Sequence, residues 1–166
     1  MAALFAESQF DRGEHPNDPL ASMLSNERAQ SLPFVGPLGR LIDQHAKQFG
    51  MKNAGHEYFA GYLARTRFDD VASLHHDNTC CQNCLSVLYY ANATWEPSWG
   101  GETLFFDESG DAACSVSPKP GRIAIFNSFL LHRGGIPMRN APVERFVVAI
   151  FYYCQEGLQK IASRGT

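Results

Sequence analysis

The sequence has no long hydrophobic run and no excess of basic charge, and each absence disfavours a class of protein. No stretch approaches the roughly 20 apolar residues of a membrane-spanning helix. The formal net charge is −3 and the pI is near 6.0, which disfavours a basic nucleic-acid platform. The N-terminus lacks a basic segment ahead of its apolar residues, so we expect no signal peptide.

Cysteine is sparse and odd in number, the five positions being Cys80, Cys81, Cys84, Cys114 and Cys154. An odd count without an export signal favours free thiols in a reducing compartment, so we expect a soluble, intracellular and cytoplasmic protein. Cys81 and Cys84 have the spacing of half a zinc site, but a structural zinc normally needs two such pairs. We therefore interpret Cys80, Cys81 and Cys84 as a turn rich in free thiols.

The composition is that of a globular protein, with 45% hydrophobic and 19% charged residues among 166. This length predicts a single domain over residues 1–166, with a helical support region (1–52) and a β-rich core (57–154). In the first region, Asp18 and Pro19 suit the start of a helix that carries Leu20 and Leu24 on one face. Apolar residues spaced three and four apart predict a second helix over 37–49.

From residue 57 onward, short apolar runs alternate with turn-forming residues. The runs predict strands at 57–64, 85–91, 102–106, 122–126 and 145–153. Many strands about ten residues apart favour a mainly β sandwich or barrel. The N-terminal helices would then cover one of its sheets.

A candidate metal site begins at residues 74–78, which read Leu-His-His-Asp-Asn. Side chains on a strand alternate between faces, so His75 and Asp77 share a face and His76 points away. A His-x-Asp pair by itself occurs often by chance. The pattern predicts His75 and Asp77 as ligands, and His76 as a packing residue or the donor of a hydrogen bond to a neighbour.

His132 is the candidate third ligand, because it directly follows the strand predicted over 122–126. Two imidazoles and one carboxylate can hold one face of an octahedral ion and leave three positions open. That arrangement is diagnostic of non-haem Fe(II) oxygenases.

Arg145 opens the predicted strand 145–153 and shares a face with Val147, Ala149 and Phe151. A buried arginine without a partner is costly, so this side chain should meet an anion. A dicarboxylate would supply one through a two-pronged guanidinium–carboxylate contact.

Together these residues resemble the iron- and 2-oxoglutarate-dependent dioxygenases. The segment VLYYANATWEPSWGGETLFFD (87–107) resembles the prolyl 4-hydroxylase-like branch, and PKPGRIAIFNSFLLH (118–132) resembles the strand leading to its distal histidine. The resemblance spans roughly residues 57–154. It implies a double-stranded β-helix, a jelly-roll or cupin-like barrel with helices packed on one sheet.

Carried onto matching positions, the resemblance implies Fe(II) bound by His75, Asp77 and His132. Arg145 and Tyr90 would bind the distal carboxylate of 2-oxoglutarate. Tyr62 would line the same pocket, although its spacing to His75 is longer than the family usually shows. The implied reaction hydroxylates a C–H bond with O2 and releases succinate and CO2. Ascorbate is an auxiliary reductant that this chemistry admits.

The resemblance favours a peptidyl prolyl residue as substrate. A small molecule or free amino acid is the alternative, because a compact chain has little extra surface for a long partner. A non-catalytic, metal-binding cupin-like barrel is a third hypothesis, which dependence on 2-oxoglutarate would separate from the enzymes. We expect neither a membrane nor a nucleic acid as partner.

Overall fold

The computed structural model describes residues 1–13, 18–45, 48, 57–77, 84–153 and 159. In this part of the chain no helix is long and apolar enough to cross a membrane. The helical elements are α1 (Ala2–Ala6), α2 (Asn26–Gln30), α3 (Val35–His45) and the 3-10 turn η2 (Pro97–Trp99). The strands are β1 (Asp11–Arg12), β2 (Leu20–Met23), β3 (Glu57–Thr66), β4 (Leu85–Tyr90), β5 (Thr103–Phe106), β6 (Ala112–Val116), β7 (Ile123–Asn127), β8 (His132–Gly134) and β9 (Arg145–Tyr153).

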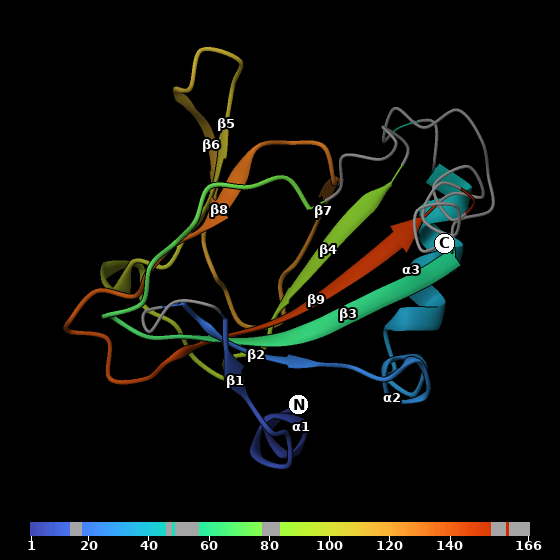
Figure 1. The fold of residues 1–166 in the computed structure, drawn as a ribbon, viewed down its shortest axis with the longest axis horizontal. Coiled ribbons are helices and arrows are strands. Elements are labelled where there is room, and N and C mark those ends of the chain that lie inside the picture. The colour runs from blue at the N-terminus through green and yellow to red at the C-terminus, as the bar shows by residue number, and fades with distance from the viewer. Residues whose placement is uncertain (14–17, 46–47, 49–56, 78–83, 154–158, 160–166) are drawn as a thin grey trace.

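The described strands form two antiparallel sheets that face each other (Figure 1). The larger sheet has the order β1-β2-β3-β9-β4-β7, and the smaller one the order β6-β5-β8. Strands neighbouring in a sheet are mostly distant in the chain: β9, near the C-terminus, lies between β3 and β4. This is the sandwich of antiparallel sheets that the alternating pattern predicts.

The five strands predicted from the sequence are confirmed as β3, β4, β5, β7 and β9, with ends shifted by one or two residues. The helix predicted to begin at Asp18 is wrong, because Leu20–Met23 form β2 and pair antiparallel with β3. Pairing with the edge of a sheet satisfies the backbone of this short segment, and it outweighs the local capping signal. The second predicted helix is α3, which begins two residues earlier than expected, and the predicted end at residue 49 lies outside the described residues.

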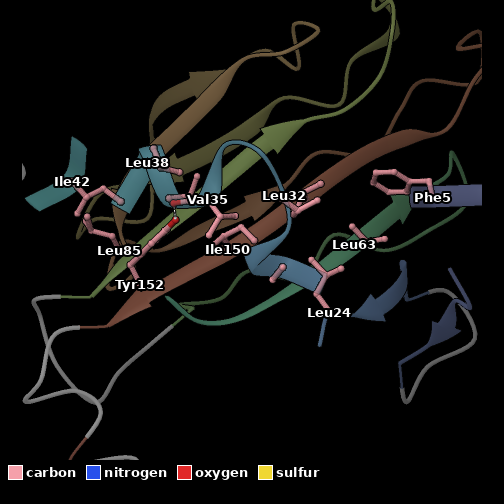
Figure 2. Packing of buried hydrophobic residues seen from close by; sticks show 13 residues of the cluster. Phe5, Leu24, Leu32, Val35, Leu38, Ile42, Leu63, Leu85, Ile150 and Tyr152 are labelled. Carbon is pink, nitrogen blue, oxygen red and sulfur yellow. Dashed lines mark hydrogen bonds between the residues drawn. The ribbon is translucent and has the colours of Figure 1, made fainter. Parts of the chain in front are cut away.

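One face of the larger sheet is covered by the helices. The buried side chains of β3, β4 and β9 on this face meet apolar residues of α1, α2 and α3 (Figure 2). The Tyr152 hydroxyl also donates a hydrogen bond to the Val35 carbonyl at 2.8 Å, which ties β9 to the start of α3 (Figure 2). Burial of this face therefore anchors the sheet without using residues of the opposite face.

The opposite face of the larger sheet looks toward the smaller sheet. A second cluster of buried residues lies there, centred on Leu88, Tyr90, Phe126, Val147 and Ala149. Because side chains alternate along each strand, β4 and β9 contribute to both clusters at once, which explains why both strands are apolar along nearly their whole length. The candidate site is built on this inner face.

Candidate metal centre

A single pair of backbone hydrogen bonds brings the two candidate histidine ligands together. The His75 amide donates to the His132 carbonyl at 2.9 Å, and the His132 amide donates to the His75 carbonyl at 3.0 Å. This isolated antiparallel bridge adds the residue at position 75 to the edge of β8. The two imidazole rings consequently lie with their centroids 4.4 Å apart.

Asp77 completes the cluster. Its Oδ1 lies 3.3 Å from His75 Nε2 and its Oδ2 lies 3.5 Å from His132 Nε2. One ligand atom from each of the three residues lies within 4.8 Å of the others. The His132 and Asp77 side chains are almost fully buried, whereas that of His75 is 42% exposed. The cluster therefore opens to solvent on the His75 side.

Both histidines present the correct nitrogen to an ion. His75 Nδ1 lies 2.9 Å from the Ser73 carbonyl, and His132 Nδ1 lies 2.8 Å from the Leu130 carbonyl. A carbonyl only accepts hydrogen bonds, so each Nδ1 carries a proton, and in the neutral imidazole each Nε2 is left with a free lone pair for an ion. Without an ion, His75 Nε2 can take up a second proton and donate it to Asp77. Two neutral imidazoles and a carboxylate that converge in this way suit a divalent ion such as Fe(II).

The electrostatics of the cluster keep the carboxylate ionised. Burial alone would raise the pKa of Asp77, but hydrogen bonds from His75 and Ser86 and the nearby His132 together hold it below its ordinary value. The hydrogen bond to Asp77 raises the pKa of His75, whereas burial lowers that of His132. The rings of Phe105 and Phe126, with centroids 5.7 and 4.8 Å from that of His132, account for this burial.

His76 lies apart from the cluster, although it sits between two of its members in the chain. Its Nδ1 lies 2.7 Å from the Phe129 carbonyl, and its ring lies tilted against the Phe129 ring, with centroids 5.4 Å apart. The interpretation of His76 as a packing residue with a hydrogen bond to a neighbour agrees with this position.

Arg145 lies on the same inner face, nearly fully buried at 4% exposure. It donates one hydrogen bond, from Nη2 to the Thr103 hydroxyl at 2.9 Å, and its guanidinium carbon lies 5.4 Å from the centre of the Tyr90 ring. Its Nε is buried and has no hydrogen-bond partner among the described residues. A buried, permanently charged group with five donors and so few acceptors calls for an anion.

The Arg145 side chain is held on one side by Thr103 and Tyr90. The Tyr90 hydroxyl lies 2.8 Å from the Thr103 hydroxyl, which in turn accepts from Arg145. The three residues come from β4, β5 and β9, so they are assembled only when the two sheets meet. Sequence reasoning found Tyr90 and Arg145 but missed Thr103, whose one signal was a polar residue in an apolar strand.

The chain approaches Arg145 closely just before β5, at Gly101. This residue has φ of +79°, and a Cβ there would lie 3.0 Å from the Trp95 ring and 3.3 Å from Arg145 Cδ. Glycine is therefore needed at this position both for its backbone conformation and for space.

Tyr62 lies on the inner face of the larger sheet, packed against the second cluster of buried residues. Its side chain projects from β3 toward Phe151 on the inner face, with ring centroids 5.9 Å apart. Burial raises the pKa of Tyr62 to about 12, the negative charge of Asp77 adds to the rise, and the positive charge of Arg145 opposes it. Both charged groups are therefore near enough to act on this phenol.

Replacing Tyr62 by phenylalanine is expected to make the metal-free protein less sensitive to alkali. The unfolded chain loses the phenolic proton near pH ~10, whereas the folded protein keeps it until about pH 12, so the stability contributed below pH ~10 is lost as the pH rises between these values. Thermal unfolding of wild type and variant, measured from about pH 8 to about pH 11, checks this. Equal losses of stability in the two proteins would contradict it.

Asn92 clamps the backbone on both sides of Arg145. Its Nδ2 donates to the Glu144 carbonyl at 2.7 Å, and its Oδ1 accepts from the Phe146 amide at 2.8 Å. The side chain is buried and takes the place of a strand residue where the pairing of β4 with β9 ends. It thus fixes the start of β9 and the backbone of Arg145.

Asn92→Ala is expected to lower the free energy of unfolding by about 2–4 kcal/mol, because it leaves two buried backbone groups without partners. Urea unfolding of the wild type and the variant measures this difference. Asn140→Ala is the matched control, since exposed Asn140 donates only one long hydrogen bond, at 3.4 Å to the Ser98 carbonyl. A loss no greater than that of the control would show that the clamp is not needed.

The turn of free thiols lies mostly outside the described residues, which leave out Cys80, Cys81 and Cys154. Cys84 is buried, and Cys114 is an exposed, free cysteine. The interpretation of this segment as a turn rich in free thiols, rather than as part of a zinc site, therefore stays a prediction.

The candidate site lies in the part of the chain that matches a known protein family. The model of the 2OG-Fe(II) oxygenase superfamily matches residues 62–153, more than half of the chain and a range that contains every residue of the cluster. None of the curated protein sequences compared with the chain matches it.

Solved structures with the same fold share little sequence with this chain. A prolyl-4-hydroxylase from Pseudomonas putida has a TM-score of 0.64 at 19% identity, over 93% of this chain and 82% of that one. A prolyl hydroxylase from Trichoplax adhaerens, in complex with a peptide fragment of hypoxia inducible factor, has 0.63 at 15%, over 94% and 76%. SnoN, a non-heme α-ketoglutarate dependent epimerase from nogalamycin biosynthesis, has 0.64 at 12%, over 91% and 69%. These similarities identify the fold as the double-stranded β-helix.

Proposed function

Because the chain belongs to the 2OG-Fe(II) oxygenase superfamily, we propose that it hydroxylates a C–H bond of a peptidyl prolyl residue. His75, Asp77 and His132 would hold the Fe(II), and Arg145 with Tyr90 would bind the distal carboxylate of 2-oxoglutarate. The family uses Fe(II), 2-oxoglutarate and O2, and releases succinate and CO2. When bound, the iron supplies the oxidation of the C–H bond.

The observation that carries the proposal is the buried Arg145, with its unpaired Nε, on the inner face that also bears the His-Asp-His cluster. A structural metal site does not require a buried cation beside it. A dicarboxylate bound to the ion at one end and to Arg145 at the other would pair with this cation. Tyr62, a neutral phenol at physiological pH, would line the space between them and exclude water.

A peptide substrate is favoured by the surface beside the cluster. Leu74, Phe129 and Leu130 are large apolar residues with exposures of 52%, 42% and 46%. Leu74 precedes His75, and the Leu130 carbonyl holds the His132 ring. Exposed apolar groups gathered at the solvent-open side of a site are typical of surfaces that bind a partner. They would contact the residues that flank the reacting proline.

A small-molecule substrate is the second candidate. SnoN, an enzyme of nogalamycin biosynthesis, resembles this chain in fold as well as the bacterial prolyl-4-hydroxylase does. The fold therefore does not choose between the two classes of substrate, because substrate specificity lies in loops rather than in the barrel.

Turnover assays with Fe(II), 2-oxoglutarate and O2 test the proposal. Proline-containing peptides should stimulate succinate release above the uncoupled rate and gain the mass of one oxygen atom. Free amino acids and proline-free peptides of the same length are the controls. Stimulation by small molecules alone would favour the second candidate, and no 2-oxoglutarate turnover under any condition would contradict both.

A further inference from the structure

In the described part of the chain, β7 lies at the edge of the larger sheet, and its free edge borders an apolar groove. We propose that this edge binds the β7 edge of a second copy of the chain, so that two larger sheets join in a two-fold symmetric dimer. The groove has a volume of about 740 Å³ and is lined mainly by residues of β5, β6 and β7. The inference goes beyond the proposed reaction, because none of the candidate metal or co-substrate residues lines the groove.

The hydrogen bonds between β4 and β7 show which backbone groups of β7 reach the free edge. The Ser128 amide donates to the Cys84 carbonyl at 2.9 Å, and the Tyr90 amide donates to the Arg122 carbonyl at 3.0 Å. Residues that face each other in an antiparallel pair alternate between hydrogen-bonded and non-hydrogen-bonded pairs. Along the β4–β7 register between these two bonded pairs, the even-numbered residues of β7 bond to β4. The odd-numbered residues therefore turn their backbone groups away from β4.

The N–H and C=O groups of Ile123 and Ile125 consequently face the groove. Within the described part of the chain, these groups have no backbone partner on the free edge. A free edge is usually protected from pairing by a charged residue, a proline or a bulge. The residues of β7, Ile-Ala-Ile-Phe-Asn, include neither charge nor proline, and their register with β4 has no bulge. The free edge of β7 is therefore open to another strand.

The spacing of the free groups suits a second copy in antiparallel orientation. With Ala124 opposite Ala124 of the second copy, Ile123 of each copy faces Ile125 of the other. Each such pair exchanges both of its hydrogen bonds, so every free group of the two isoleucines finds a partner. The small Ala124 side chain also suits the closer approach of a non-hydrogen-bonded pair. Across the groove, the first four residues of β6 (112–115) are small and exposed, which leaves room for the added strand.

The charges at the two ends of the groove favour a second copy over an unrelated strand. Arg122 lines one end, directly before β7, where its Nη1 donates to the Ser117 carbonyl at 2.9 Å. Asp107 lines the other end, next to Phe106, whose amide donates to the Leu131 carbonyl beyond β7 at 2.9 Å. Antiparallel pairing brings Arg122 of each copy to the Asp107 end of the other. The groove is thus complementary in charge to itself.

Sedimentation velocity of the full chain tests the dimer. One short strand edge makes a small interface, so the concentration range should run from about 1 to about 200 µM. We expect the average mass to rise from the 18.4 kDa of one chain toward twice that value. A monomer at every concentration would overturn the inference, including a monomer whose groove binds a proline-containing peptide instead.

Amide hydrogen exchange of the wild-type protein, followed by NMR at the two ends of this range, locates the interface. The amides of Ile123 and Ile125 should exchange slowly only at the high concentration. Those of Ala124 and Phe126 bond to β4 and should exchange slowly at both. A dimer that leaves the exchange of Ile123 and Ile125 unchanged would contradict the proposed interface.

Ile123→Pro and Ile123→Val form a matched pair of variants. Proline is tolerated at the first residue of a strand, and here it removes an N–H that faces the free edge. Valine is of similar size and keeps that N–H. Ile123→Pro is expected to raise the dimer dissociation constant roughly 5- to 150-fold, because each dimer loses two hydrogen bonds. Ile123→Val should stay close to wild type. A proline variant that dimerises as tightly as the valine variant would overturn the inference.

Asp107→Asn tests the charge at the end of the groove. Asparagine keeps an Oδ1 acceptor for the amides of Ser109 and Asp111 and removes only the charge. Dimerisation should weaken about two- to tenfold, since two exposed ion pairs are lost. Glu108→Gln is the matched control, because it makes the same change in net charge at a residue that does not line the groove. Equal weakening in the two variants would contradict the antiparallel orientation, from which the contact of Asp107 with Arg122 follows.

Discussion

His132→Ala is expected to abolish Fe(II) binding at concentrations that saturate the wild-type protein. The variant removes one of three converging ligand atoms and leaves a single imidazole with the Asp77 carboxylate. Replacing even the hydrogen-bond partner of a ligand typically costs 10- to 100-fold in affinity, so losing the ligand should cost more than about 100-fold. His132 is nearly fully buried, and no other imidazole among the described residues lies within the cluster to replace it.

The measurement is an anaerobic titration of the metal-free protein with Fe(II) in the presence of 2-oxoglutarate. The visible charge-transfer absorption that the two give together reports their joint binding. His76→Ala is the matched control, because His76 neighbours His75 in the chain but contacts Phe129 instead of the cluster. It should keep the absorption. An unchanged absorption in His132→Ala, or its loss in His76→Ala, would contradict the assignment of the ligands.

Arg145→Ala is expected to raise the dissociation constant of 2-oxoglutarate by roughly 30- to 5,000-fold while Fe(II) affinity stays within about twofold. Truncating one partner of a buried, hydrogen-bonded charge pair costs about 2–5 kcal/mol, and each 1.4 kcal/mol is about tenfold. The guanidinium is buried beside Thr103 and Tyr90, so water cannot replace it effectively. Succinate as a competing ligand should weaken in parallel, because it carries the same distal carboxylate.

Arg145→Lys and Arg145→Met separate charge from geometry. Lysine keeps the positive charge but lacks the two-pronged donor, so its affinity for 2-oxoglutarate should lie between those of wild type and Arg145→Ala. Methionine removes a buried cation that has few partners in the ligand-free protein, so thermal unfolding of that variant should occur at the wild-type temperature or above it. A large loss of stability in Arg145→Met would indicate that Arg145 serves the fold rather than an anion.

Much of the fold follows from local patterns that the sequence displays openly. The strands β3, β4 and β9 carry long apolar stretches, and each was expected close to its observed range. The neighbours His75 and Asp77 were expected to act together because side-chain alternation on an extended segment depends only on nearby residues. Their ligand atoms indeed lie 3.3 Å apart.

Other parts of the structure cannot be recognised from the local sequence pattern. The three-residue strand β8 is too short to show a period, and β2 directly follows residues that suit the start of a helix. Thr103 looks like an ordinary strand residue in the sequence. Its contacts depend on what lies opposite it, and this is decided by the pairing of strands that are far apart in the chain.

The sequence by itself determined the positions of most strands, and it predicted the two-histidine, one-carboxylate ligand set and an anionic partner for Arg145, because residue chemistry and strand alternation are local properties. Only the tertiary structure decided that His75 meets His132 across one pair of backbone hydrogen bonds. It also decided that Thr103 joins Tyr90 to Arg145. The physical reason is that strand register fixes which side chains share a face and come within hydrogen-bond distance, and register is settled by the packing of both sheets together.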